Sequence, residues 1–274
     1  MSGSIRIAVV SCRAFVGNAQ KNLDMMERCL DMPGVQGAGI VCFPECSLTG
    51  YTIAADAASL AHEVPGPLTA RLVETCAARG IALAAGLVER GREGCFITQV
   101  AAGPDGLMGA YRKTHLSPGE MRVFTPGRDF PVFAWNGFSF GIGLCYDAHF
   151  PELATIYALA GAHILFYPHA SPPPESAVEK RDRWMRYLPA RAYDNALYVA
   201  SCNQSGTNEH GMVFRGLNLI LDPKGRLVAE SQGEDESAAS AEVSRELLDK
   251  IRSSEQGFFL KGRRPGLYGG LAKP

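Results

Sequence analysis

Residues 138–152 read FSFGIGLCYDAHFPE, an apolar strand pattern that runs directly into the start of a helix. The two glycines, Gly141 and Gly143, would let neighbouring backbone approach this strand closely. Pro151 suits the first position of a helix, because the N–H that proline lacks has no partner there. Cys145 therefore lies at a predicted strand-to-helix turn, where α/β proteins expose residues at the carboxyl edge of a sheet.

Strand-like and helical patterns alternate on both sides of this stretch. Runs rich in β-branched and aromatic residues predict strands, and apolar residues at helical spacing predict helices between them. The predicted strands cover residues 5–10, 40–43, 82–87, 96–100, 138–144, 164–167, 198–201 and 216–221, and the predicted helices cover residues 19–31, 67–79, 151–160, 178–195 and 246–253. This alternation is typical of an α/β fold whose helices cover the faces of a sheet.

The middle of the chain argues against a purely parallel sheet. The strand candidates at 82–87 and 96–100 are joined by the turn-rich residues 89–94, and a third follows the turn at 104–106. Such spacing predicts antiparallel hairpins. We therefore expect a mixed sheet, or two sheets packed face to face with helices outside. Because no repeat or linker divides the chain, a single domain over residues 1–274 is predicted.

Composition excludes several classes of protein. The chain has 274 residues, of which 46% are hydrophobic and 20% charged, as in ordinary globular proteins. A formal net charge of −1 gives no field that would attract nucleic acid or an anionic membrane. No run reaches the roughly 18 apolar residues of a membrane span, and Arg6 interrupts the first apolar run, which disfavours a secretory signal. We expect a cytoplasmic protein that takes a small ligand.

The chain contains eight cysteines, and most of them lie inside apolar runs. Seven are expected to be buried, reduced thiols. Position alone also favours a structural role for Cys145, because free cysteine mostly behaves as a small buried hydrophobe. A nucleophilic role requires a base or a nearby cation, since a thiol with a pKa near 8.5 is only a few per cent ionised at neutral pH.

Three charged residues are candidates for activating such a thiol. Glu45 directly follows the buried-looking strand at 40–43, where a carboxylate is costly without a partner. Lys113 follows another β-like segment, and a desolvated ammonium can stabilise a developing oxyanion. Glu120 lies in a nearby turn and could be a second acid of the same site. For each of them the alternative is a solvated side chain at the end of a strand or in a turn.

Three segments together resemble a known family. Residues 43–51 read FPECSLTGY, residues 111–116 read YRKTHL and residues 143–152 read GLCYDAHFPE. In this order they resemble the three signature segments of the nitrilase superfamily of carbon–nitrogen hydrolases. The resemblance implies a four-layer α-β-β-α sandwich with mixed sheets.

The resemblance also implies roles for particular residues. Glu45, Lys113 and Cys145 correspond to a catalytic triad of base, oxyanion partner and nucleophile, and Glu120 to a second glutamate that helps to position the substrate. The amide of Tyr146 is expected to complete the oxyanion hole. The further candidates for substrate contact are Tyr51, His149 and His169.

The expected activity is hydrolysis of a small linear amide or N-carbamoyl compound through a cysteine thioester, with release of ammonia or an amine. Tyr146 and Asp147 after the cysteine favour this over nitrile hydrolysis, because nitrilases tend to carry Trp-Glu there. Neither a metal nor an organic cofactor is required. A nitrilase, a catalytically idle binding protein and a redox-active thiol protein remain the alternatives.

Substrate and partners are less determined. An ω-amide of a dicarboxylate or an N-carbamoyl compound is the leading substrate, and its distal group would be bound by residues after the loop at 172–175, for which Arg186, Arg191 and Asn195 are the candidates. A homo-oligomer, at least a dimer, is expected. The tail at about 255–274, which includes the apolar residues 258–260, is expected to contribute to that contact.

Overall fold

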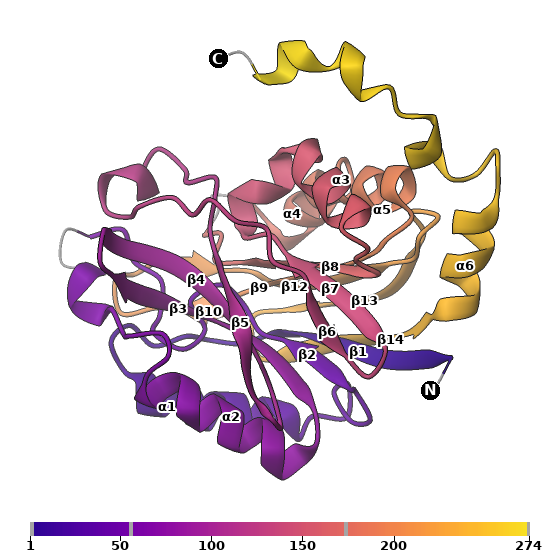
Figure 1. Ribbon diagram of the computed structural model, residues 1–274. Coiled ribbons are helices and arrows are strands. Elements are labelled where there is room, and N and C mark those ends of the chain that lie inside the picture. The colour runs from indigo at the N-terminus through magenta and orange to yellow at the C-terminus, as the bar shows by residue number, and fades with distance from the viewer. Residues whose placement is uncertain (1–2, 55–56, 173–174, 273–274) are drawn as a thin grey trace.

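The fold is a four-layer sandwich in which two six-stranded mixed sheets pack face to face between two layers of helices (Figure 1). The computed structural model describes residues 3–54, 57–172 and 175–272. Both the mixed sheets and the outer helices agree with the α-β-β-α architecture expected from the sequence, so that prediction is confirmed.

The first sheet joins the N-terminal strands to a strand from near the C-terminus. Its order is β14-β1-β2-β3-β4-β5, in which β1, β2 and β3 are parallel and the other neighbours are antiparallel. The strands are β1 (Ser4–Ser11), β2 (Ile40–Cys42), β3 (Ala82–Gly91), β4 (Gly94–Gly103), β5 (Gly106–Arg112) and β14 (Ser237–Ser244). The two predicted hairpins are present as β3-β4 and β4-β5.

The second sheet contains the strand that ends before Cys145. Its order is β13-β12-β9-β8-β7-β6, in which β7, β8 and β9 are parallel. The strands are β6 (Phe133–Trp135), β7 (Phe138–Ile142), β8 (Ile164–His169), β9 (Tyr198–Asn203), β12 (Gly216–Leu221) and β13 (Leu227–Gly233). A separate small ribbon pairs β10 (Gly206–Thr207) with β11 (Val213–Phe214).

Helices α1 and α2 cover the first sheet, and α3, α4 and α5 cover the second (Figure 1). The α-helices are α1 (Ala19–Leu30), α2 (Pro67–Arg79), α3 (Pro151–Leu159), α4 (Ala177–Trp184), α5 (Leu188–Asn195) and α6 (Arg245–Ser253). Short 3₁₀ helices are η1 (Ala57–Leu60), η2 (Glu120–Arg122), η3 (Cys145–His149), η4 (Phe259–Gly262), η5 (Pro265–Leu267) and η6 (Gly269–Ala272).

Two predictions of secondary structure were wrong. The single helix expected at 178–195 is divided into α4 and α5, because Pro189 occupies the first turn of α5 and could not sit inside a continuous helix. No strand was expected in the Ser- and Glu-rich residues 231–240, yet residues 231–233 belong to β13 and residues 237–240 to β14. Antiparallel pairing with β1 holds β14 in the sheet, although most side chains of β14 are small or polar.

The three interfaces between the four layers each have their own apolar core. In β1, Ile7 and Val9 point between the sheets, while Ala8 and Val10 point toward α1 and α2. A third core lies between the second sheet and helices α3 and α5. A strand that is buried on both faces loses the polar alternation of a half-exposed strand, which explains the continuous apolar run at 7–10.

All eight cysteines are free thiols. Six of the seven that were expected to be buried are buried, whereas Cys95 is only partly buried at the start of β4. Among residues 3–54, 57–172 and 175–272, no helix combines the length and the apolar character needed to cross a membrane.

Candidate active site

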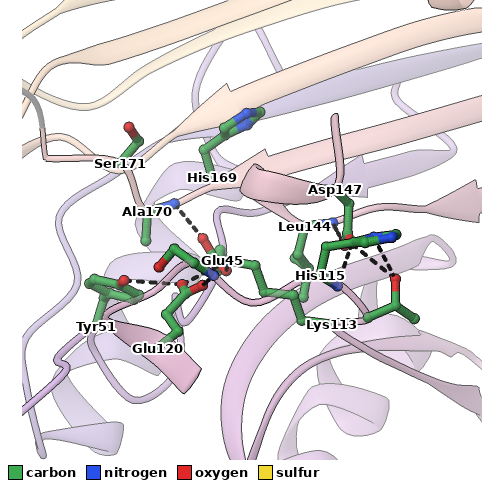
Figure 2. A network of polar contacts seen from close by, with 12 residues as sticks. Glu45, Tyr51, Lys113, His115, Glu120, Leu144, Asp147, His169, Ala170 and Ser171 are labelled. Atoms are coloured by element: carbon green, nitrogen blue, oxygen red, sulfur yellow. Dashed lines mark hydrogen bonds and ion pairs between the residues drawn. The ribbon is translucent and has the colours of Figure 1, made fainter. Parts of the chain in front are cut away.

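The three proposed catalytic residues come from the carboxyl ends of different strands. Glu45 follows β2, Lys113 follows β5 directly, and Cys145 follows β7. The ends of these strands meet where the two sheets face each other, so side chains far apart in the sequence reach the same place. Figure 2 shows Glu45, Lys113 and Glu120 pointing toward one another.

Lys113 is the centre of this group. Its Nζ donates to Glu45 Oε1 at 2.8 Å and to Glu120 Oε1 at 2.7 Å. All three side chains are buried, with exposed fractions of 2% or less. Tyr51 completes the group by donating its hydroxyl to the same Glu120 oxygen at 3.0 Å. The buried ammonium is therefore shared by two carboxylates, which compensate its charge where water cannot.

Groups from both sheets fix the side chain and the backbone of Glu45. Its second oxygen, Oε2, accepts the amide of Ala170, which follows β8, at 2.8 Å, and its carbonyl accepts the side-chain amide of Gln204 at 2.8 Å. On the other side the turn lies directly on β3, because a Cβ at Gly86 would be 2.2 Å from the amide nitrogen of Cys46. Both the side chain and the backbone of Glu45 are thus fixed in position.

The charges of this group depend on burial and on one another. Burial raises the pKa of Glu45 to about 7; Lys113 opposes this rise and the charge of Glu120 adds to it. Burial also acts to lower the pKa of Lys113, but the negative charges around it outweigh that effect, and its pKa is raised above the ordinary value. Lys113 therefore stays protonated at neutral pH, whereas Glu45 can gain or lose a proton.

Cys145 begins the 3₁₀ turn η3 with a φ of +44°, in the left-handed region that residues with a Cβ rarely adopt. The sharp turn directs the chain from β7 into α3. Burial, followed by the negative charge of Glu45, raises the pKa of the Cys145 thiol to about 12. The raised pKa favours the neutral thiol at pH 7. Gly141 and Gly143 were expected to let neighbouring backbone approach the strand. Side chains approach them instead, since a Cβ at Gly141 would be 2.4 Å from the Tyr157 ring.

Asp147 joins the cysteine turn to the lysine loop (Figure 2). Its Oδ2 accepts the Leu144 amide and the Tyr111 hydroxyl, both at 2.7 Å. Its Oδ1 accepts the His115 amide at 2.9 Å and the Thr114 hydroxyl at 3.0 Å. The sequence placed Asp147 in a signature segment but did not reveal this role. Its fully buried carboxylate holds the backbone on both sides of the site.

A cavity of about 250 Å³ opens onto these residues. Its lining is Tyr51, Lys113, Ser117, Glu120, Cys145, Tyr146, His149, His169, Ala170, Ser171, Pro172 and Arg183. All the residues predicted to act in catalysis or to contact the substrate near Cys145 line this cavity except Glu45, which is hydrogen-bonded to Lys113 at its wall. Residues 173 and 174 of the loop expected to shape the cavity lie outside the described part of the chain.

The residues expected to bind the distal group of a substrate are placed differently. Arg186, Arg191 and Asn195 do not line the cavity: the Arg191 guanidinium donates to the Ala148 carbonyl, and Asn195 accepts the Thr155 hydroxyl. Arg183 lines it instead. The sequence analysis did not name it, because the candidates were chosen only for following the loop at 172–175, and which residues of this region face the cavity depends on how α4 packs.

The two histidines of the cavity are neutral. Burial lowers the pKa of His169, and the Nδ1 atom of this residue lies 2.7 Å from the Tyr167 carbonyl oxygen. A carbonyl only accepts, so Nδ1 carries the proton and Nε2 is left as a hydrogen-bond acceptor. Desolvation, with the positive charges of Arg183 and Arg191, lowers the pKa of His149.

Comparison with known proteins agrees with this arrangement. A family model described as carbon-nitrogen hydrolase matches residues 6–253. The chain belongs to the carbon-nitrogen hydrolase family. This membership confirms the resemblance of the three signature segments, and it covers both sheets and nearly all the helices that surround the site.

This carbon-nitrogen hydrolase is 30% identical to an (R)-stereoselective amidase from a Pseudomonas species, over 84% of this chain and 81% of the relative. It is 29% identical to a nitrilase from Pyrococcus abyssi, over 96% and 99% of the two chains. A solved amidase from Nesterenkonia sp. matches with a TM-score of 0.82 and 28% identity, covering 99% of this chain and 98% of that one. Structures of that amidase include a covalent acetamide adduct at its active site cysteine and a cysteine variant bound to butyramide.

The Asp147 network leads to a prediction about stability. Replacing Asp147 with Asn should lower the free energy of unfolding by about 2 to 4 kcal/mol, because an amide offers one acceptor oxygen to several buried donors. Urea unfolding measures this change. The control is Asp182→Asn, whose side chain is 60% exposed and which should change stability by less than about 0.5 kcal/mol. Equal stability of the two variants would contradict the assigned role.

Proposed function

We propose that this carbon-nitrogen hydrolase is an amidase that cleaves a small linear amide or N-carbamoyl compound through a thioester on Cys145. The observation that carries the proposal is the buried Lys113, bonded to Glu45 and Glu120 at the wall of a cavity that also exposes Cys145. The amide ligands of the Nesterenkonia amidase support it. The cavity volume of about 250 Å³ suits a small substrate.

The first step is attack by the cysteine. Because the thiol has a pKa of about 12 and Glu45 one of about 7, the carboxylate must take the thiol proton as the sulfur attacks. A carbon–sulfur bond forms, and the electron pair of the carbonyl moves onto oxygen. Glu45 is then neutral and the substrate carries a tetrahedral oxyanion.

Lys113 stabilises this oxyanion, together with the backbone N–H of Tyr146. The ammonium is suited to the task because its neighbours keep it protonated and because it is already desolvated in the resting protein. A charge that is oriented before the reaction needs no reorganisation as the oxyanion forms. Glu120 and the Tyr51 hydroxyl hold the ammonium at this position.

The remaining steps return the proton. Glu45 donates it to the leaving nitrogen, the carbon–nitrogen bond breaks, and ammonia or an amine departs. Glu45 next removes a proton from water, which attacks the thioester. Collapse of this second intermediate releases the acid, and the sulfur regains its proton from Glu45. One carboxylate thus serves in both half-reactions, and every group that moves a proton belongs to this chain.

A nitrilase is the second candidate, favoured by the similarity to the Pyrococcus protein. The same three residues could attack a nitrile, so the site alone does not separate the two reactions. A redox thiol protein fits less well: the Cys145 thiol has a pKa of about 12, and no other cysteine is among the described residues that line the cavity. An idle family member would not require the complete Glu45, Lys113 and Cys145 arrangement.

The decisive test follows ammonia release from a panel of amides, N-carbamoyl compounds and nitriles. We expect an amide to be preferred over its matched nitrile and intact mass to show the acyl adduct. Cys145→Ala should lower kcat/KM at least about a thousandfold, because it removes the nucleophile. Cys95→Ala, which removes another partly buried thiol, is the matched control and should retain activity.

The outcomes distinguish the candidates. Turnover that survives Cys145→Ala would refute Cys145 as the nucleophile. Preference for nitriles would identify a nitrilase, and a wild-type protein inactive on the whole panel would refute the amidase proposal.

The pKa values predict the pH dependence. The kcat/KM value should rise as pH increases through about 7, because Glu45 accepts the thiol proton only when it is deprotonated. Glu120→Gln should move this limb of the profile to lower pH in the residual activity, since the Glu120 charge raises the pKa of Glu45. An acid limb near the ordinary glutamate pKa, unchanged in the variant, would contradict the raised pKa of Glu45 and its dependence on Glu120.

We also propose that the protein is a cytoplasmic homo-oligomer, at least a dimer, whose contact includes the tail at about 255–274. Figure 1 shows the yellow C-terminal segment leaving α6 and running above helices α3 to α5. Phe259, Leu267 and Leu271 on this tail are 46%, 66% and 69% exposed. A second copy of the chain would bury this apolar surface.

Sedimentation velocity at micromolar concentration tests the oligomer. The wild type should sediment as a dimer or a larger species. The double variant Leu267→Asp and Leu271→Asp should shift toward the monomer, because charges at these positions would be costly to bury. A folded monomeric wild type would contradict the proposal.

A further inference from the structure

A cluster of three charged side chains lies at the part of the cavity wall formed by α4. Arg183 lines the cavity together with Cys145. Glu175 forms ion pairs with both Arg183 and Lys180. The amidase mechanism uses none of these residues. They belong to the segment that follows β8, whereas the catalytic base and lysine come from the other sheet.

The cluster is tightly connected. Arg183 Nε lies 3.2 and 3.1 Å from the two oxygens of Glu175, and Arg183 Nη2 donates to Oε1 at 2.5 Å. Lys180 Nζ is 3.7 Å from the same oxygen and donates to the Ser171 carbonyl at 2.9 Å. Lys180 has no exposed side-chain surface. Glu175 is thus the shared counter-charge of two cations.

The charges do not cancel. The Arg183 guanidinium keeps the pKa of Glu175 below its usual range, so Glu175 is an anion. Burial lowers the pKa of Lys180 to about 8, which leaves most of its ammonium groups protonated at pH 7. With His149 neutral, this part of the wall contains two positive charges and one negative charge. The excess positive charge lies where burial limits its compensation by water.

Arg183 also has free hydrogen-bonding capacity. Glu175 occupies Nε and Nη2, but no residue of the described ranges accepts a hydrogen bond from Nη1. The guanidinium side chain is 33% exposed, in contrast to the fully buried Lys180. It can therefore offer N–H groups to a ligand in the cavity. A carboxylate is the ligand group that best matches the charge and planar geometry of a guanidinium.

We propose that Arg183 binds a carboxylate at the far end of the substrate, so that the preferred substrates are short monoamides of dicarboxylic acids. This inference rests on the proposed amidase function and deepens it. The amide group occupies the wall near Cys145 and Lys113, and the carboxylate occupies the wall near Arg183. The excess positive charge there attracts anionic amides and disfavours cationic ones.

A purely structural role for the cluster makes a different prediction. If Arg183 only holds the segment before α4 through Glu175, its loss affects all amides alike. A carboxylate anchor instead affects anionic amides far more than neutral ones of the same length. The ratio of kcat/KM values between such substrates separates the two roles, because general damage to the fold cancels in the ratio.

The experiment compares three amides of similar size: succinamate, which carries a carboxylate, neutral butyramide and cationic 4-aminobutanamide. We expect the wild type to prefer succinamate over butyramide at least tenfold, with the cationic amide poorest. Arg183→Met should lower the succinamate-to-butyramide ratio at least tenfold, mainly through the KM for succinamate. Arg181→Met is the matched control, since Arg181 lies on the same helix, pairs with Glu230 and does not line the cavity; it should leave the ratio unchanged.

Binding to the Cys145→Ala variant tests the anchor without turnover. Calorimetry should show tighter binding of succinamate than of butyramide, and adding Arg183→Met should remove the difference. Equal binding of the two amides, or an unchanged turnover ratio in Arg183→Met, would overturn the anchor. Turnover of butyramide with no preference for succinamate would refute the anchor but not the amidase function. No turnover of any amide would refute the amidase function, and the binding result would then still decide the anchor.

Discussion

The buried ammonium of Lys113 is the interaction on which the rest of the site depends. An isolated ammonium in a protein interior costs several kcal/mol, so it requires anionic partners at close range. Those partners, Glu45 and Glu120, lie on segments that follow different elements, and Glu45 also takes the amide of Ala170 from the second sheet. Glu45 thus connects the lysine of the first sheet to the second sheet at the edge where their strands end.

Asp147 is a second buried acidic residue that connects separate segments of the site. Its carboxylate accepts hydrogen bonds from the lysine loop and from the residues at the turn that begins at Cys145. The left-handed backbone of Cys145 is unfavourable in isolation and persists only where its surroundings determine it. Asp147 supplies part of that determination, because it binds the amide of the preceding Leu144 and the loop that carries Lys113.

Local signals and distant contacts explain what the sequence could and could not predict. Glu45, Lys113 and Cys145 each follow an apolar strand within a short signature, so the sequence could predict both the fold and the meeting of these three residues in one region. The role of Asp147 depends on donors more than 30 positions away in sequence, such as Tyr111 and His115, and no local pattern encodes them. Arg183 was not predicted because its position at the cavity depends on the packing of α4 against the second sheet, which no local pattern of the sequence encodes.

The pKa values of Cys145 and Glu45 together explain how the site can rest without being reactive. A thiol with a pKa of about 12 is a poor nucleophile and is also poorly oxidised, since both reactions require the thiolate. A carboxylate with a pKa of about 7 is a weak acceptor for such a proton until the developing oxyanion is stabilised by Lys113. In the proposed mechanism, proton transfer is therefore favourable only when a carbonyl group lies between the sulfur and the ammonium. The buried charge of Lys113 would thereby couple the reactivity of the thiol to the presence of substrate.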